Sequence, residues 1–442
     1  MNKKLHLVSL GCTKNLVDSE VMLGRLKEYE IIDDAAQADV IIVNTCGFID
    51  AAKEESINTL LNLHDMRKRD SVLVMSGCLS ERYREELQAE LPEIDIFTGV
   101  GDYEKIDALI ATKQSSFSPE VYLATERSGR VITGSNYHAY IKIAEGCNQA
   151  CSFCAIPSFK GKLHSRSPDS IRKEVENLVE EGFYDFSFIS QDSSSYGRDR
   201  GLKDGLIDLI ETVEGIKGVV SARILYLYPS TTTFALIDAI ADSNVFQTYY
   251  DMPIQHIDDR MLRIMKRGFG EERTIGLLEH MKSKPGAFIR TSVIAGHPGE
   301  NEESFERLCD FMGYFKFDRF NVFAYSNEET TASYGMEQLP QEVIDARAAV
   351  LGEMAQVATL QSLEEMIGEK VTVVVDGESE EHTYLLSARP LIWAVDIDGE
   401  ILINDTSDLP VGYGKRYEAR ITELAGDQLL ATLISEQVAV SK

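Results

Sequence analysis

The first 110 residues alternate between continuous apolar runs and segments whose apolar residues recur at helical spacing. A continuous apolar run such as residues 40–43 is typical of a strand buried on both faces of a parallel sheet. We therefore predict an open α/β domain with a parallel sheet over residues 1–115. The expected strands cover 5–10, 39–44 and 71–76, and the expected helices cover 17–29 and 51–68.

A stretch rich in serine and threonine, residues 116–136, indicates a linker. The alternation of strands and helices resumes at residue 137 and continues to 367. Ser167 followed by Pro168 is a helix start, because serine caps a helix and proline suits its first position. About six βα units predict a partial, TIM-like barrel with its site at the carboxyl ends of the strands. The expected strands cover 139–143, 186–190, 222–227, 247–251, 288–295 and 319–323, and a long helix is expected over 341–366.

Beyond Gly368 the apolar period changes to two, which is typical of strands with one buried face. Short strands separated by turn residues predict a small all-β barrel over 368–436. Trp393, the single tryptophan, belongs either to the core of this barrel or to an exposed binding surface, and the pattern does not decide. The expected strands cover 371–375, 384–387, 392–396, 401–404, 417–422 and 429–434.

The chain is strongly acidic, with 44 Lys and Arg against 72 Asp and Glu and a formal net charge of -28. Such a surface repels phosphate backbones and attracts basic partners. No apolar stretch has the length of a membrane-spanning helix, and the apolar run near the start is too short for a signal peptide. Seven cysteines, an odd number, do not suggest a disulfide framework. We therefore expect the protein to be located in the reducing cytoplasm.

Three closely spaced cysteines are the most specific feature of the chain. Cys147, Cys151 and Cys154, the barrel triad, follow an expected strand with the spacing Cys-x-x-x-Cys-x-Phe-Cys. Structural zinc takes four protein ligands, so this triad alone does not complete a zinc site. Thiolates also hold iron–sulfur clusters, and three of them can hold three irons of a [4Fe–4S] cube while the fourth iron stays open.

A second set of cysteines ends the three expected strands of the first domain. These residues, the strand-end triad, are Cys12, Cys46 and Cys78. Equivalent ends of parallel strands lie along one edge of the sheet, where such folds bind their ligands. A free cysteine is also a common core residue, but a glycine beside each of the three favours convergent metal ligands. We therefore predict a second iron–sulfur cluster at this edge.

With both triads, the chain resembles the radical S-adenosylmethionine (SAM) superfamily and, within it, the methylthiotransferases. The resemblance covers nearly the whole chain and includes a terminal barrel of the TRAM type. It implies that the barrel triad is the catalytic centre, whose cluster binds SAM and yields a radical that removes a hydrogen from an unactivated carbon. It also implies that the strand-end triad holds a second [4Fe–4S] cluster, which carries the sulfur to be inserted.

The resemblance suggests four further contacts to SAM. Phe153 matches the aromatic position that lies against the adenine, and Gln191 falls near the contact for the methionine amino group. Arg290 lies in the expected strand that leads to Gly296, in a turn that resembles the family's late glycine motif.

Two methylthiotransferase classes share this layout: one acts on a tRNA adenosine and the other on an aspartate of a small-subunit ribosomal protein. Segments 9–20, 155–162 and 226–229 resemble the ribosomal-protein class. This resemblance implies methylthiolation of the β-carbon of an aspartate in the decoding-centre protein numbered twelve. It also implies an electron donor and a sulfur donor as partners.

The charge of the last domain favours the same class. From residue 364 onward, 6 Lys or Arg stand against 16 Asp or Glu. A barrel that grips RNA needs a basic face, whereas an acidic barrel suits a basic ribosomal protein. The acidic residues can also serve only to solvate the surface. We do not expect RNA binding to be the main role.

Two alternatives stay open at this point. The first is a tRNA adenosine methylthiotransferase. The second is a non-catalytic protein that senses redox state through iron–sulfur clusters or binds zinc, which metal and sulfide analysis would distinguish.

Overall fold

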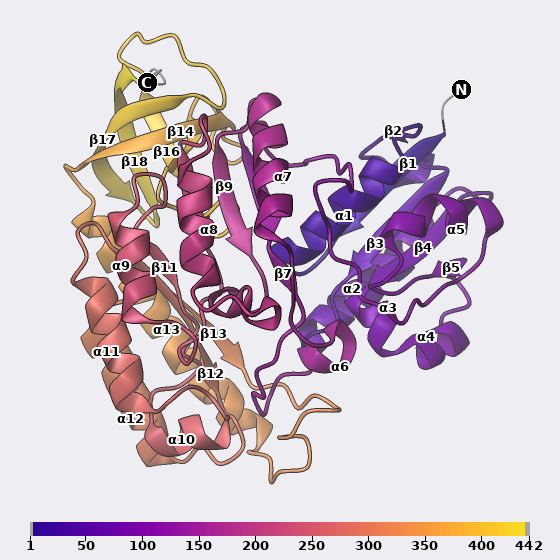
Figure 1. Ribbon diagram of the computed structural model, residues 1–442, viewed down its shortest axis with the longest axis horizontal. Coiled ribbons are helices and arrows are strands. Elements are labelled where there is room, and N and C mark those ends of the chain that lie inside the picture. The colour runs from indigo at the N-terminus through magenta and orange to yellow at the C-terminus, as the bar shows by residue number, and fades with distance from the viewer. Residues whose placement is uncertain (1–2, 438–442) are drawn as a thin grey trace.

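The computed structural model describes residues 3–437, which form an α/β region, a partial barrel and a small β-barrel. In Figure 1 the N-terminal α/β region (indigo) lies beside the central partial barrel, and the C-terminal β-barrel (yellow) lies at one end of it. The fold class predicted from the sequence is confirmed.

The N-terminal region is a parallel sheet in the order β2-β1-β3-β4-β5. Helices α1 and α5 pack on one face, and α2 and α4 pack on the other. Since both faces are covered, β3 and β4 are buried throughout, which explains their continuous apolar sequence. The strands are β1 (Lys4–Ser9), β2 (Glu30–Ile31), β3 (Val40–Thr45), β4 (Val72–Gly77) and β5 (Ile96–Phe97). The helices are α1 (Thr13–Arg25), α2 (Asp50–Met66), α3 (Cys78–Arg82), α4 (Arg84–Glu90) and α5 (Ile106–Thr112), with 3₁₀ turns η1 (Ala35–Gln37) and η2 (Tyr103–Lys105).

Helix α1 begins directly after Cys12, whereas the apolar pattern predicts a helix over 17–29. Its first turn carries Lys14 and Asn15, which are polar yet buried. A search for apolar periodicity misses such a turn, because its buried side chains are themselves polar.

Six parallel strands form the partial barrel in the order β6-β9-β10-β11-β12-β13. A single bridge between Ala222 and Phe246 joins the two three-stranded halves. Helix α7 starts as the sequence predicts, with the Ser167 hydroxyl accepting a hydrogen bond from the Ser170 backbone. The strands are β6 (His138–Lys142), β9 (Asp185–Ile189), β10 (Ser221–Ile224), β11 (Tyr249–Asp251), β12 (Phe288–Ala295) and β13 (Arg319–Ala324), with the short pair β7 (Ala144–Glu145) and β8 (His164–Ser165). The helices are α6 (Ile156–Lys160), α7 (Pro168–Glu180), α8 (Gly205–Glu214), α9 (Phe234–Asp242), α10 (Asp259–Ile264), α11 (Glu271–Lys282), α12 (Glu302–Phe315) and α13 (Gln341–Glu365), with 3₁₀ turns η3 (Ser193–Ser195) and η4 (Arg198–Arg200).

The C-terminal region is a closed barrel in the order β14-β15-β16-β18-β17. The strands are β14 (Lys370–Glu378), β15 (Leu386–Pro390), β16 (Ile401–Asp405), β17 (Arg416–Ala425) and β18 (Gln428–Glu436). The strand predicted over 392–396 is wrong, because this segment forms turns. Trp393 is 1% exposed and lies near Phe288 and the Arg319 guanidinium, so the tryptophan is core rather than an exposed anchor.

A buried ionic contact joins the C-terminal barrel to the starts of the central strands. Asp185, the first residue of β9, is fully buried and accepts from Arg223 at 2.9 Å and from Arg389 of β15 at 2.7 Å. Phe288 and Arg319, which meet Trp393, likewise begin their strands. The C-terminal barrel therefore covers the amino ends of these strands, and in Figure 1 the arrow of β9 points away from it.

Replacing Asp185 with asparagine should destabilise the protein strongly, because the two guanidiniums then face a neutral amide. We expect a loss on the order of 3 kcal/mol in the free energy of unfolding, measured by urea titration. The matched control is Lys370→Gln, which removes the half-exposed ion pair with Glu418 and should cost less than about 1 kcal/mol. Equal losses in the two variants would contradict the role given to Asp185.

Candidate active site at the domain junction

The strand-end triad lies at the carboxyl ends of three neighbouring strands. Cys12 follows β1, Cys46 follows β3, and Cys78 follows β4. Gly11 has a left-handed φ of 87°, and a Cβ there would lie 2.8 Å from the Cys46 sulfur. The absence of a side chain at Gly11 therefore leaves room for that sulfur. Cys12 acts electrostatically on both other thiols, so the three share one edge of the sheet.

Burial keeps two thiols of this triad, those of Cys46 and Cys78, protonated. It raises the pKa of Cys46 to about 11 and the pKa of Cys78 to about 12. Lys160 opposes the rise in the pKa of Cys78, and Lys14 opposes the rise in the pKa of Cys46. Because metals bind the thiolate, a metal centre bound by this triad would release protons on binding and would be favoured as the pH rises.

The barrel triad lies in the loop between β7 and α6, beyond the carboxyl end of β6. Gly146 has a φ of 77°, and a Cβ there would lie 2.2 Å from the Lys162 carbonyl oxygen, so only glycine lets the loop close this tightly. The Cys147 backbone donates to the Gly161 carbonyl at 3.1 Å. Burial raises the pKa of Cys147 to about 11 and the pKa of Cys154 to about 12.

The third thiol of this triad lies beside a cation. The Cys151 sulfur is 3.3 Å from the Tyr228 hydroxyl and 3.5 Å from Arg267 Nη1. The guanidinium of Arg267 also lies over the ring of Tyr228, 3.9 Å from its centroid, and is 6% exposed. Sequence reasoning missed Arg267, because it lies 116 residues from Cys151 and in no motif.

A histidine holds the middle of the cysteine loop. His297 Nε2 lies 2.9 Å from the Ser152 hydroxyl, and Nδ1 lies 2.8 Å from the Pro298 carbonyl. Since a carbonyl can only accept, Nδ1 carries the proton and Nε2 accepts from Ser152. Burial lowers the pKa of His297 to about 4, so the ring is neutral. The Ser152 backbone also donates to the Met265 carbonyl, which fixes the loop from a second side.

Two of the predicted SAM contacts lie beside this loop. Phe153 is half-buried and meets His297 edge-on, with ring centroids 6.2 Å apart. Gly296 has a φ of 82°, and a Cβ there would lie 2.7 Å from Ile344. Its backbone N–H donates to Glu300 at 3.0 Å. The structure thus places Phe153 and Gly296 on the same side of the barrel mouth.

The other two predicted contacts lie in different places. Gln191 follows β9 at the barrel mouth and donates through Nε2 to Glu145. Its buried Oε1 has no hydrogen-bond partner among residues 3–437. Arg290 is the third residue of β12 and pairs with Asp251 at 3.0 Å. Its Nε lies 3.7 Å from Asp398 of the C-terminal barrel, so Arg290 lies nearer that barrel than the cysteines do.

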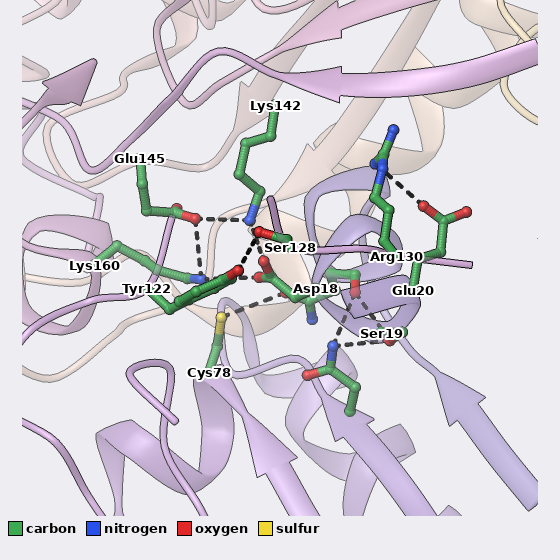
Figure 2. Close-up of polar contacts among 12 residues, drawn as sticks. Asp18, Ser19, Glu20, Cys78, Tyr122, Ser128, Arg130, Lys142, Glu145 and Lys160 are labelled. Atoms are coloured by element: carbon green, nitrogen blue, oxygen red, sulfur yellow. Dashed lines mark hydrogen bonds and ion pairs between the residues drawn. The ribbon is translucent and has the colours of Figure 1, made fainter. Parts of the chain in front are cut away.

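Four buried charges form a closed set between the two triads, which we call the junction charge cluster: Asp18, Lys142, Glu145 and Lys160. Lys142 lies 2.5 Å from Asp18 and 2.8 Å from Glu145, and Lys160 lies 3.5 and 3.6 Å from the same two carboxylates. Figure 2 shows the Cys78 sulfur beside this cluster. Burial alone would raise the pKa of Glu145, but Lys142 and Lys160 hold it at about 2. A lysine inside the apolar strand at 139–143 was the one sequence signal for this cluster.

Two tyrosines after β10 connect the two triads. The Tyr226 hydroxyl lies 3.4 Å from Thr13 Oγ1, next to Cys12, and the Tyr228 hydroxyl lies 3.3 Å from the Cys151 sulfur. Tyr226 has a φ of 63°, which a bulky residue seldom adopts. The strained turn directs one tyrosine to each triad, and both triads therefore face the same junction.

All seven cysteines are free thiols. Within residues 3–437, no three His, Cys, Asp or Glu side chains are close enough together to hold a single metal ion. In the same part of the chain, no helix combines the length and the apolar character needed to cross a membrane.

Comparison with known proteins adds three family matches to this geometry. Residues 4–99 match the family described as "Uncharacterized protein family UPF0004", residues 141–312 match the radical SAM superfamily, and residues 367–434 match the TRAM domain. A solved structure of the radical SAM methyltransferase TsrM from Kitasatospora setae has a TM-score of 0.54. It is 14% identical and covers 76% of this chain and 74% of its own, so it shows the fold alone.

Curated relatives match the chain along almost its full length. The ribosomal protein uS12 methylthiotransferase RimO of Sulfurovum sp. (strain NBC37-1) is 80% identical over 434 residues, which cover 98% of this chain and 99% of the relative. The RimO protein of Aliarcobacter butzleri (strain RM4018) is 64% identical over 437 residues, with 98% of each chain covered.

The fold, the cysteine loop and the family matches together show that the chain is a radical SAM transferase with a TRAM domain. Within that class, the chain belongs to the RimO family of methylthiotransferases. The family predicted from the sequence is confirmed, and an enzyme replaces the non-catalytic sensor as the interpretation of the chain.

Acid should weaken the fold through His297. The folded-state pKa is about 4 and the ordinary value is about 6.5, so the unfolded chain takes up the proton first. The free energy of unfolding should therefore fall as the pH drops from about 6.5 to about 4, by up to ~1.4 kcal/mol per pH unit. His297→Gln should remove this part of the slope in urea titrations at pH 7 and pH 5. His382→Gln, which replaces an exposed histidine, is the control. If His297→Gln loses as much unfolding free energy between pH 7 and pH 5 as wild type does, His297 is not the source of the acid sensitivity.

Proposed function

We propose that this protein places a methylthio group on the β-carbon of an aspartate in the small-subunit ribosomal protein uS12. The observation that carries the proposal is 80% identity, over almost the full length, to a relative named as a uS12 methylthiotransferase. The two cysteine triads at one junction support it, because this reaction needs both a hydrogen-abstracting centre and a source of sulfur.

Each triad fits a [4Fe–4S] cluster, since three thiols can hold three irons and leave one for a further ligand. The barrel triad would hold the cluster that binds SAM, and the strand-end triad would hold the second one. When bound, the first cluster and SAM supply the radical chemistry that no side chain can provide.

The chain's own residues fit the binding of SAM at the barrel triad. The Gln191 Oε1, buried without a partner among the described residues, is an acceptor for the SAM amino group. Phe153 offers a face or edge to the adenine, and Gly296, next to the histidine that meets Phe153, stays a predicted contact. Arg267 offers a cation to the SAM carboxylate. Arg290 stays a predicted contact, although Asp251 already engages its guanidinium.

The junction charge cluster keeps the space between the triads dry. Its two cations and two anions balance, so these four side chains add no net charge to the junction. Lys160 also acts on Cys78 and favours the thiolate that a metal needs. Exclusion of water protects a reactive radical from side reactions.

The acidic TRAM barrel supports a protein substrate rather than RNA. Two adjoining clefts of about 340 and 750 Å³ share an acidic wall in this domain. Their acidic residues are Asp376, Glu378, Glu380, Glu381, Asp396 and Glu400. A wall of this charge attracts a basic ribosomal protein and repels the phosphates of tRNA.

The proposal requires partners that the chain does not provide. An electron donor must reduce the barrel cluster, and a sulfur donor must replenish the strand-end cluster. Free thiols at both triads fit a reducing compartment, so the cytoplasm is the proposed place of action.

The test is anaerobic turnover of the reconstituted enzyme with SAM, a reductant and a sulfide source. The ribosomal protein uS12 and unmodified tRNA are offered separately, and products are measured by mass spectrometry together with 5′-deoxyadenosine. The proposal expects a methylthio mass gain on the ribosomal protein only. A gain on tRNA with none on the protein would assign the chain to the RNA-modifying class.

Removing one triad at a time should separate the two halves of the reaction. Triple Cys→Ala replacement of the strand-end triad should lower iron from about eight to about four per chain and abolish the methylthio product, while 5′-deoxyadenosine still forms. The same replacement in the barrel triad should leave about four irons and no 5′-deoxyadenosine. Cys309→Ala, a half-buried cysteine outside both triads, is the control and should keep all the iron.

A further inference from the structure

Lys14 is a buried cation without an anionic partner. Its side chain lies in the first turn of α1, and the residue is 8% exposed. The ammonium rests on the ring of Tyr226, 3.3 Å from the centroid. Across residues 3–437, no carboxylate oxygen lies within 4.0 Å of it. An aromatic face replaces only part of the water that a buried ammonium loses.

The neighbouring buried lysines differ from Lys14 in this respect. Lys142 and Lys160 each contact both carboxylates of the junction charge cluster, Asp18 and Glu145. Two cations and two anions make that cluster neutral, and neither of its carboxylates contacts Lys14, although the charge of Glu145 reaches the ammonium. Lys14 therefore brings to the junction a positive charge that has no ion-pair partner among residues 3–437, and an anion that enters the junction would be bound there.

The position of Lys14 shows where such an anion would lie. The residue is two positions from Cys12 of the strand-end triad, and its ammonium rests on Tyr226. Two residues beyond Tyr226, the Tyr228 hydroxyl touches the Cys151 sulfur of the barrel triad. Tyr226 adopts this position with a strained, positive φ, and strained residues of this kind cluster at functional sites. Lys14 thus lies between the two triads.

We propose that Lys14 binds the side-chain carboxylate of the substrate aspartate and so selects aspartate over uncharged residues. This inference rests on the proposed function. The reacting β-carbon carries that carboxylate directly, so a reaction between the two triads brings the carboxylate next to Lys14. A charge-assisted hydrogen bond in a dry site fixes the β-carbon and rejects asparagine, which leaves the ammonium unpaired.

A different role would be to neutralise the charge of the strand-end cluster, since the charge of Lys14 also acts on Cys46. The two roles predict different losses. A lysine that serves the cluster is needed for iron to be retained, whereas a lysine that serves the substrate is needed only for binding and selecting the aspartate.

The experiment compares wild type, Lys14→Gln and Lys14→Arg as reconstituted holoenzymes. Binding of a fluorescent uS12 peptide that carries the acceptor aspartate is measured by anisotropy, beside the same peptide with Asp→Asn. The control variant is Arg25→Gln, which removes an exposed cation from the other end of α1. Thermal melting confirms folding, and iron and sulfide are measured on every sample.

Wild type and Arg25→Gln should bind the aspartate peptide about tenfold or more tightly than the asparagine peptide. Lys14→Gln should bring this ratio close to one with iron unchanged, and Lys14→Arg should preserve it. A preserved ratio in Lys14→Gln would overturn the inference, and so would a loss of about four irons in that variant. If wild type does not methylthiolate uS12 at all, it is the proposed function that fails.

Discussion

A buried ion pair between Asp18 and Lys142 is the contact on which the site depends most. Asp18 belongs to α1 of the N-terminal region and Lys142 ends β6 of the barrel, and neither side chain is exposed. An ion pair of this kind adds little net stability, but a misplaced partner leaves a charge stranded in the interior. Only one relative position of the two domains satisfies both charges. That position brings the strand-end triad to the barrel mouth.

A second polar contact supports the same position from the far side of the N-terminal sheet. Glu328, in the segment after β13, is buried and pairs with Lys53 at 3.0 Å and with Arg82 at 2.7 Å. Arg82 ends the short helix that Cys78 begins. The helix that begins at Cys78 of the strand-end triad is therefore attached to the barrel that carries the other triad. Two separated attachment points restrict hinge motion between the domains more than one would.

Much of the fold was predictable from local pattern, because β3 and β4 are buried on both faces and their apolar runs cannot be mistaken for surface segments. The strand-end triad could be found for the same reason, since parallel strands share an edge. The segment 392–396 shows the limit of this reasoning. Its apolar residues fill the contact between two domains instead of forming a strand, and an apolar run alone does not distinguish the two.

The junction charge cluster lay beyond sequence reasoning because its members come from α1, β6, β7 and α6. Lys142 stands out as a lysine inside an apolar strand, but the other three members resemble ordinary solvated residues until the tertiary structure brings them together. Arg267 is hidden in the same way. The start of α1 was missed for a related reason: its buried side chains, Lys14 and Asn15, are polar, and a search for hydrophobic periodicity does not detect them.

The placement of the TRAM barrel at the amino ends of the central strands has a consequence for the shape of the substrate. The triads lie at the opposite ends, and β12 alone, with eight residues, spans roughly 26 Å at about 3.3 Å per residue. A partner that grips the TRAM barrel must therefore reach along the whole height of the central barrel to deliver one side chain. A projecting loop on a larger body has that reach, and a small compact ligand does not.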